Sequence, residues 1–192
     1  MFAQAGKKKL RYALLNHRRA LTPSQVKDYS QNICRRIITQ PTFKKAIHIG
    51  IYMNKDNEVD VSTLLNLPNK HFYLPVLKID WTLEFHPYQL DDPCYLNSWG
   101  IREPYQQQQQ SIPAHQLDMV ILPMVGFTQA GQRLGMGKAC YDRSFSATSS
   151  PFLLGVAFAF QELEQIPVEP HDLIMNLIIT EKKTIHPIPK SC

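Results

Sequence analysis

The sequence predicts a single domain over residues 1–192 with a three-layer α/β/α fold and a mostly parallel central sheet. Two apolar runs, Met119 to Leu122 and Phe152 to Ala159, are typical of central strands that other layers cover on both faces. Helical and strand-like stretches alternate along the chain, which favours a sheet between layers of helices. A chain of 192 residues, 44% of them hydrophobic and 19% charged, is long enough to bury the core of such a domain.

Two helices are expected at the N-terminal end. Lys7 to Ala20 places apolar and polar residues with the period of an amphipathic helix. Thr22 suits the N-cap of a second helix, and Pro23 suits its first helical position. Apolar residues from Val26 to Ile37 continue this helix at spacings of three and four.

The other strands are expected from apolar or alternating stretches. They are buried strands at Ala46 to Met53 and His71 to Leu77, a more exposed strand at Leu83 to Tyr88, and a last short strand at Leu177 to Thr180. The glutamine run from Gln106 to Gln110 is typical of a solvated loop insertion. The sequence has no internal repeat and no convincing linker.

Charge and cysteine content indicate which partners and which cellular compartment to expect. The 21 lysines and arginines exceed the 16 acidic residues, so the surface should attract nucleotides, phosphorylated or polyglutamated metabolites, or nucleic acid. No apolar run approaches the roughly 20 residues of a membrane-spanning helix. The N-terminal region, with Lys7, Lys8 and Lys9, lacks the apolar centre of a secretion signal. Four widely separated cysteines indicate free thiols in reducing cytoplasm.

The most informative stretch is glycine-rich and cationic, from Gly131 to Arg143. It follows the strand that ends at Leu122 and precedes an expected helix. Glycines allow a ligand to approach main-chain N–H groups closely, and a strand, a glycine-rich turn and a helix start together suit phosphate binding. The alternative is a surface loop in which the glycines only form turns.

This segment matches neither of the two common phosphate-binding motifs. The phosphate loop of ATPases needs glycine at the position of Gln132 and serine or threonine at that of Ala139. The dinucleotide fingerprint needs glycine at the position of Cys140. An ordinary phosphate-loop ATPase and a nicotinamide enzyme are therefore disfavoured. Lys138 and Arg133 remain suited to neutralising the negative charge of phosphoryl transfer.

Other polar residues gather after expected strands. Asn54 to Asp60, the glycine-rich loop and Glu162 to Asp172 each follow the carboxyl end of a strand, where ligands of such sheets bind. Lys7 and Arg11 share one helix face, which serves either phosphates or solvent. Glu58 either belongs to a solvated turn or accepts hydrogen bonds from an amino-heterocycle.

Two further sets of residues leave alternatives open. Asp142 either holds Mg²⁺ or forms a salt bridge with Arg143 or Arg133. The residues around Gly100 either line an apolar ligand pocket or belong to the core: Trp99, Ile101, Glu103 and Tyr105. None of the seven histidines has the spacing of metal ligands.

The segment from Gly131 to Arg143 resembles the Arg-Leu-Gly-x-Gly-Lys-Gly-Tyr-Tyr-Asp-Arg signature of the 5-formyltetrahydrofolate cyclo-ligases, or 5,10-methenyltetrahydrofolate synthetases. This signature is highly specific, and the similarity spans most of the chain. It includes Lys7-x-x-x-Arg11, Glu58-Val59-Asp60, Gly100-Ile101-Arg102-Glu103-Pro104, Leu122-Pro123-x-Val125-Gly126-Phe127, Ile166-Pro167, His171-Asp172 and Thr180-Glu181.

The resemblance implies a reaction and its participants. The family closes 5-formyltetrahydrofolate to 5,10-methenyltetrahydrofolate, with ATP as co-substrate and Mg²⁺ as cofactor, giving ADP and phosphate. The formyl oxygen is phosphorylated, N10 attacks, and phosphate leaves. The chain is accordingly expected to be a monomeric cytoplasmic ligase of folate and one-carbon metabolism, with reduced folate and ATP as its partners and no nucleic-acid or membrane partner.

The resemblance also implies site residues. Those at ATP are Lys7, Lys8, Lys9, Leu10, Arg11, Arg133, Leu134, Gly135, Met136, Gly137, Lys138, Ala139, Cys140 and Tyr141. Those at folate are Arg11, Met53, Glu58, Met136, Gly137, Lys138, Ala139 and Cys140. Lys138, Arg133 and Tyr141 are expected to be catalytic, and Asp142 and Asn176 to hold the metal ion.

Three positions depart from the family pattern. Ala139 replaces the third loop glycine, Cys140 the first tyrosine of a pair, and Asn176 a carboxylate near the metal. They motivate a second hypothesis, a catalytically weak folate-binding or folate-buffering protein of the same fold. A third, a basic nucleic-acid-binding module, has the net charge of +5 in its favour, but the sequence lacks an interleaved aromatic and basic pattern.

Overall fold

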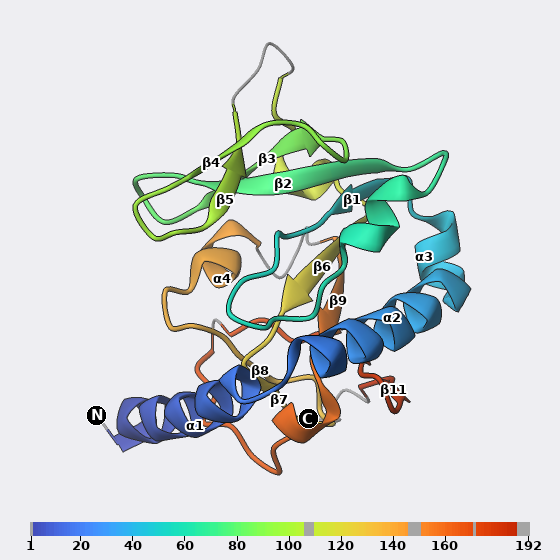
Figure 1. Cartoon of the computed structure of the whole chain (residues 1–192). Helices are drawn as coiled ribbons and strands as arrows, with labels where there is room; N and C mark the ends of the chain where they lie inside the picture. The colour runs from blue at the N-terminus through green and yellow to red at the C-terminus, as the bar shows by residue number, and fades with distance from the viewer. Residues whose placement is uncertain (1, 106–109, 146–150, 171, 188–192) are drawn as a thin grey trace.

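The computed structural model describes residues 2–105, 110–145, 151–170 and 172–187, with side chains from residue 6 onward. Within these ranges the centre is a seven-stranded sheet in the order β11-β10-β9-β6-β1-β2-β3 (Figure 1). Its strands are β11 (Thr184–Ile185), β10 (Leu177–Ile179), β9 (Phe152–Val156), β6 (Met119–Pro123), β1 (His48–Gly50), β2 (His71–Leu77) and β3 (Leu83–Tyr88). The five inner strands are parallel, and the two edge strands are antiparallel. The predicted mostly parallel α/β fold is confirmed.

Helices cover both faces of the sheet, but unequally. On one face lie α2 (Pro23–Thr39), α3 (Pro41–Lys45) and the 3₁₀ helix η1 (Ser62–Asn66). The other face carries only short helices, η2 (Ala114–Gln116) and α4 (Cys140–Ser144). Figure 1 shows α2 and α4 on opposite sides of the central strands. The long helix α1 (Phe2–Arg19) instead packs against the structure that follows β6.

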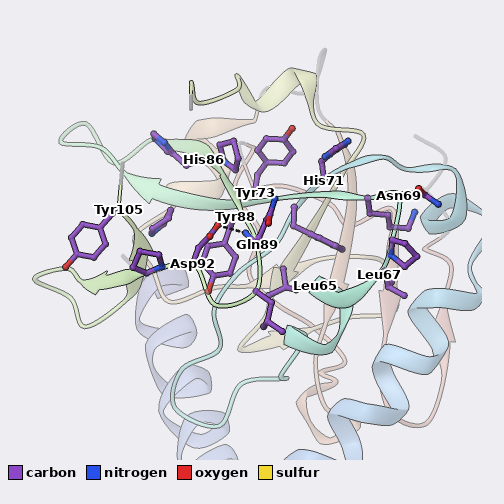
Figure 2. A pocket seen from close by; sticks show the side chains of 17 residues that line it. Leu65, Leu67, Asn69, His71, Tyr73, His86, Tyr88, Gln89, Asp92 and Tyr105 are labelled. Atoms are coloured by element: carbon purple, nitrogen blue, oxygen red, sulfur yellow. Dashed lines mark hydrogen bonds between the residues drawn. The ribbon is translucent and has the colours of Figure 1, made fainter. Parts of the chain in front are cut away.

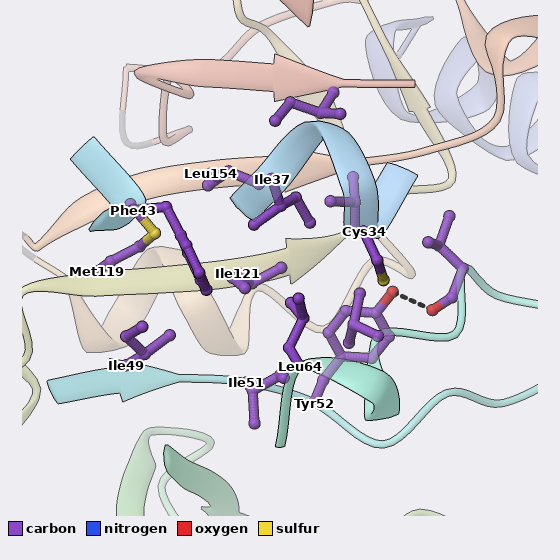
Figure 3. Close-up of a cluster of buried hydrophobic side chains, with 14 of the residues drawn as sticks. Cys34, Ile37, Phe43, Ile49, Ile51, Tyr52, Leu64, Met119, Ile121 and Leu154 are labelled. Carbon is purple, nitrogen blue, oxygen red and sulfur yellow. Dashed lines mark hydrogen bonds between the residues drawn. The ribbon is translucent and has the colours of Figure 1, made fainter. Parts of the chain in front are cut away.

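The central strands are apolar on both faces because each face has its own core. Successive side chains of a strand point to opposite faces. Met119 and Ile121 of β6 therefore pack with α2 and η1, as Figure 3 shows, whereas Val120 and Leu122 pack on the α4 side. This double burial explains the unbroken apolar run that predicts β6.

Most predicted elements are confirmed, with differences at their ends. β2 and β3 have the predicted bounds, and Thr22 caps α2 as expected: its Oγ1 accepts the N–H of Gln25 at 3.2 Å. β1 is shorter than predicted. After Gly50 the chain still pairs with β2, through a hydrogen bond from the N–H of Ile51 to the carbonyl of Tyr73, but it no longer pairs with β6. β9 ends at Val156 and the 3₁₀ helix η3 (Ala159–Gln161) follows.

Two small hairpins are present that the sequence does not predict. They are β4 (Cys94–Leu96) with β5 (Arg102–Pro104), and β7 (Gly126–Phe127) with β8 (Arg133–Leu134). Of the glutamine run, residues 106–109 lie outside the described ranges, and Gln110 is exposed. None of the described helices is both long and apolar enough to cross a membrane. That residues 1–192 form one domain stays a prediction.

Candidate active site

The glycine-rich segment lies at the carboxyl edge of the sheet, where the sequence predicts it. The chain leaves β6, forms the β7–β8 hairpin, and continues from β8 into α4 (Figure 1). Gly131 and Gly137 have φ angles of +83° and +94°, in the left-handed region that favours glycine. The helix that follows, α4, is only five residues long. The segment is therefore mostly loop, held in shape by its glycines.

Helix α1 contacts all three polar segments that follow strands. Arg11 Nε donates to the carbonyl of Gly135 in the glycine-rich loop at 2.6 Å. Lys7 Nζ donates to Asp172 Oδ2 at 2.8 Å. Arg18 Nε donates to the carbonyl of Asp56 at 3.0 Å. Residues 7, 11 and 18 lie on one face of a helix, so α1 joins the segments that the sequence expects to converge.

Arg11 lies directly against the loop. A Cβ atom at Gly137 would lie 3.3 Å from Cζ of Arg11, so a larger residue there would press on the guanidinium. Burial lowers the pKa of Arg11, and the positive charge of Arg133 adds to this, whereas Asp172 opposes it. The half-buried Arg11 and the buried side chain of Arg133 therefore lie beside one glycine-rich backbone, an arrangement that attracts anions.

The remaining predicted residues of α1 have different surroundings. Lys7 is buried and lies 3.9 Å from Glu169 in addition to its bond with Asp172. Lys8 and Lys9 are exposed, and Leu10 packs in a small core with Leu14. The contribution of Lys8, Lys9 and Leu10 to ATP binding stays a prediction.

Arg133 and Asp142 form a buried ion pair. Nη2 of Arg133 donates to Oδ2 and Oδ1 of Asp142 at 2.9 and 3.1 Å, and the two side chains are 8% and 9% exposed. Asp142 Oδ1 also accepts the N–H of Leu173. Of the two alternatives for Asp142, the structure shows the salt bridge. Among the described residues, Nε of Arg133 is a buried donor without a hydrogen-bond partner.

The other loop residues divide between the interior and the surface. Leu134 is buried, so only its backbone can meet a ligand, whereas Met136 is 58% exposed. Tyr141 packs in the core beside Phe145, its ring centroid 5.6 Å from Cζ of Arg133, and burial raises its pKa well above the usual value. Cys140 is half-buried, and burial raises the pKa of its thiol. Tyr141 is thus placed to orient Arg133 rather than to titrate near neutrality.

Lys138 is exposed and lies over two tryptophan rings. Its Nζ is 4.6 Å from the ring centroid of Trp81 and 4.5 Å from that of Trp99. Trp81 lies in the turn between β2 and β3, and Trp99 in the turn between β4 and β5. The ammonium of the predicted catalytic lysine is therefore held at the boundary between the glycine-rich loop and the hairpins.

Glu58 is buried in the turn that follows β1. Its Oε1 lies 3.6 Å from Nη2 of Arg18, and its Oε2 accepts the N–H of Lys55 at 3.1 Å. Its side chain is 14% exposed, which contradicts a solvated turn. Burial raises the pKa of Glu58, and the charge of Arg18 opposes that rise. Met53, just before this turn, is partly buried against the main core.

The residues around Gly100 have separate roles. Glu103 is buried and accepts hydrogen bonds from Leu77 N–H, Tyr95 Oη and Asn97 Nδ2, so it holds the β4–β5 hairpin to β2. Nζ of Lys55 donates to the carbonyl of Trp99 at 2.7 Å and joins this hairpin to the Glu58 turn. The interpretation of Glu103 as a pocket residue is wrong, because its carboxylate oxygens are used within the fold.

The described residues enclose cavities elsewhere. One of about 630 Å³, shown in Figure 2, lies along β2 and β3 and is lined by residues that include His71, Tyr73, Tyr88 and Tyr105. Another of about 770 Å³ lies beside the β7–β8 hairpin, between Gln132 and Glu162. Neither contains the loop from Arg133 to Tyr141. The candidate site therefore rests on the convergence of charged residues and not on the size of a cavity.

The structure does not join the two predicted metal ligands. Asn176 Oδ1 accepts the N–H of Leu153 at 2.7 Å and braces the start of β10, while the Asp142 carboxylate binds Arg133 and Leu173. Within the described ranges, no three histidine, cysteine, aspartate or glutamate side chains gather as a metal site would require. Metal binding by Asp142 and Asn176 stays a prediction.

Some residues of the site carry no clear signal in the sequence. Arg18 sits in a basic run and is marked only by sharing a helix face with Lys7 and Arg11. Trp81 lies in the turn between β2 and β3, and no motif surrounds it in the sequence. Both become part of the site through contacts with residues far along the chain, Arg18 with Glu58 and Trp81 with Lys138.

The chain is similar to proteins of a known family. The model of the 5-formyltetrahydrofolate cyclo-ligase family matches residues 3–181. The 5-formyltetrahydrofolate cyclo-ligase of Escherichia coli K12 is 33% identical over 175 residues, covering 86% of this chain and 95% of the relative; the mouse protein of that name is 24% identical over 191 residues, covering 92% and 94%.

Solved structures have the same fold. The NMR structure of Aquifex aeolicus 5,10-methenyltetrahydrofolate synthetase has a TM-score of 0.81 at 26% identity, covering 97% of this chain and 94% of the other. The synthetase of Mycoplasma pneumoniae has a TM-score of 0.71 at 25% identity, covering 91% and 98%.

Proposed function

This chain belongs to the 5-formyltetrahydrofolate cyclo-ligase family, and we propose that it uses ATP to close 5-formyltetrahydrofolate to 5,10-methenyltetrahydrofolate, releasing ADP and phosphate. One observation carries the proposal. Helix α1 brings Arg11 to the glycine-rich loop and Arg18 to Glu58, so that a site suited to phosphate and a buried carboxylate share one edge of the sheet.

The nucleotide side consists of the glycine-rich loop and its cations. Gly137 is exposed, and the Arg11 and Arg133 guanidiniums lie beside the loop. The buried Nε of Arg133 has a hydrogen atom left to donate. Such preorganised donors stabilise charge that develops on transferring phosphoryl oxygens. We assign this loop to the ATP phosphates.

The folate side is centred on Glu58. A carboxylate can accept paired hydrogen bonds from the amino group and ring N–H of a pterin. Burial raises the pKa of Glu58, and the positive charge of Arg18 opposes that rise and so favours the charged form. Met53 offers apolar surface next to it. We assign the Glu58 turn to the pterin ring.

The proposed reaction proceeds in two steps. The formyl oxygen attacks the γ-phosphorus of ATP, so that a new O–P bond forms while the bond to ADP breaks. N10 then attacks the formyl carbon and loses its proton, and the C–O bond breaks as phosphate leaves. The protein mainly positions the two substrates and neutralises charge. We expect Lys138 and Arg133 to neutralise the phosphoryl oxygens and Tyr141 to hold Arg133 in place.

We propose that a Mg²⁺ ion enters with ATP. Mg²⁺ prefers hard oxygen ligands and is commonly held by one or two carboxylates together with substrate phosphates. Asp142 is such a carboxylate, although its oxygens bind Arg133 and Leu173, and Asn176 brings no charge. Mg²⁺ would supply neutralisation of the phosphate oxygens. We also propose a monomeric, cytoplasmic enzyme.

Release of ADP tests the proposal. ADP should form from ATP in the presence of Mg²⁺ only when 5-formyltetrahydrofolate is added, and in equal amount to the folate consumed. Binding of 5-formyltetrahydrofolate without stimulated ADP release would instead favour the folate-buffering protein.

Glu58→Gln should weaken the binding of folate more than the binding of ATP. An amide accepts only one of the two hydrogen bonds that a carboxylate accepts, and a charge-assisted bond is worth about 1.5–3 kcal/mol, so KM for folate should rise about tenfold or more. Because burial raises the pKa of Glu58, kcat/KM for folate should fall as the pH drops through that raised pKa in the parent but not in the variant. Steady-state kinetics from pH 5 to 8 provide the check. A raised KM for ATP with an unchanged KM for folate would reverse the assignment of the two sites.

The second candidate function, a weak folate-binding protein, has Ala139 in its favour. This residue has φ +53° and ψ +27°, a left-handed conformation that costs a residue with a Cβ roughly 1–2 kcal/mol. Ala139→Gly should relieve that cost, less about 0.5–1 kcal/mol for the greater freedom of unfolded glycine. We expect the free energy of unfolding, measured by urea titration, to rise by up to about 1.5 kcal/mol, and kcat to rise. Lower stability together with lower kcat would show that alanine suits this loop.

A further inference from the structure

Both tryptophans of the chain lie at Lys138. The sequence contains only Trp81 and Trp99, which are 18 positions apart and belong to different turns. Their ring centroids are 5.4 Å apart with an angle of 57° between the planes. The Lys138 ammonium lies within 4.6 Å of each centroid, well inside the range of about 6 Å for a cation–π contact.

The two turns are held in place independently of Lys138. Trp81 has φ +65°, which is rare for a bulky residue, and its N–H donates to the carbonyl of Lys78 at 3.0 Å. The carbonyl of Trp99 accepts from Lys55 Nζ, and the N–H of Trp99 donates to Asn97 Oδ1. Both turns therefore have backbone contacts that do not involve Lys138.

The rings are not simply part of the core. Trp99 is 48% exposed, and Lys138 is exposed as well. In the part of the chain that the structure describes, no carboxylate lies within ion-pair distance of Lys138. Its ammonium is therefore stabilised by the faces of the two tryptophan rings. An ammonium has three donors, and ring faces occupy only one side of it.

We propose that Trp81 and Trp99 are positioning residues that fix the Lys138 ammonium through cation–π contacts, so that its remaining N–H groups face the transferring phosphoryl group. This inference rests on the proposed function of Lys138. A free lysine side chain samples many rotamers, and ordering it only at the moment of reaction would slow the reaction. The two rings order it in advance, and they connect the nucleotide loop with the hairpin that is joined to the Glu58 turn.

Tryptophan emission tests the contact itself. Because no other tryptophan contributes, quenching by acrylamide reports on these two rings. Lys138→Ala removes the aliphatic stem that covers them, so quenching should increase relative to the parent chain. Lys44→Ala, an exposed lysine on α3, is the matched control and should leave it unchanged. Equal quenching in Lys138→Ala and the parent would overturn the proposal.

Kinetics test the consequence. Trp81→Leu should lower kcat about two- to fivefold, the factor that one exposed cation–π contact represents, with both KM values unchanged. Trp81→Phe keeps a ring face and should recover most of that loss. Tyr105→Leu, which removes a half-exposed ring outside the site, is the control. A raised KM for folate with unchanged kcat in Trp81→Leu would show that the ring binds substrate and would overturn the positioning role.

The role of Lys138 and the role of the two tryptophans are distinguished by the same variants. A near-normal kcat in Lys138→Ala would remove the proposed role of Lys138 and this inference with it. Loss of turnover in Lys138→Ala, together with an unchanged kcat in Trp81→Leu, would overturn this inference alone.

Discussion

Lys138→Ala should lower kcat by about a hundredfold or more at saturating ATP and folate, while the thermal unfolding midpoint stays near that of the parent. Loss of one positioned donor at a developing charge typically costs about 10²–10³ in kcat. The side chain is exposed, and among the described residues its ammonium contacts two ring faces, so little stability depends on it.

Steady-state kinetics and thermal unfolding of the same preparation check this expectation. Lys44→Ala again serves as the control for the loss of one exposed lysine. A near-normal kcat in Lys138→Ala would mean that the lysine does not act on the phosphoryl group. A large fall in the unfolding midpoint would mean that it acts on the fold.

Asp142→Ala should destabilise the protein by about 3–5 kcal/mol, because it leaves the Arg133 guanidinium buried without its counter-charge. Nε of Arg133 already lacks a partner among the described residues, so few acceptors remain for this group. The N–H of Leu173 also loses its acceptor. Denaturant unfolding should show a lower midpoint, and activity should be lost.

A double variant separates the structural role of this pair from its catalytic role. Arg133→Met with Asp142→Leu removes both charges and should recover much of the stability that Asp142→Ala loses, because apolar replacement of a buried ion pair is often neutral. Activity should not return, since Arg133 and Asp142 are assigned to the phosphates and to Mg²⁺. An active double variant would contradict both assignments.

The sequence predicts six of the seven strands in the sheet that the structure describes, and it misses β11, which has only two residues. β2 and β3 are seven and six residues long, and their bounds are as predicted. The β4–β5 and β7–β8 hairpins have strands of two or three residues, too short to show a period. These hairpins nevertheless carry Trp99 and Arg133, so the least predictable elements form much of the site.

The site is predictable where its residues share a local motif. The glycine-rich segment contains Arg133, Lys138 and Asp142 within ten positions, and two of its three glycines adopt the left-handed backbone. Contacts over long sequence separations are not predictable in this way. Lys7 binds a residue 165 positions away, and the partner of Lys138 in the β2–β3 turn is an isolated tryptophan. Only the fold shows that such residues meet.

Formation of 5,10-methenyltetrahydrofolate, followed by its absorbance, tests the central claim most directly. With 5-formyltetrahydrofolate, ATP and Mg²⁺ together, the absorbance of the methenyl product should rise with repeated turnover. Omitting ATP, or chelating Mg²⁺, should stop the rise. No rise with all three present, or a rise of equal rate without ATP, would contradict an ATP-dependent cyclo-ligase.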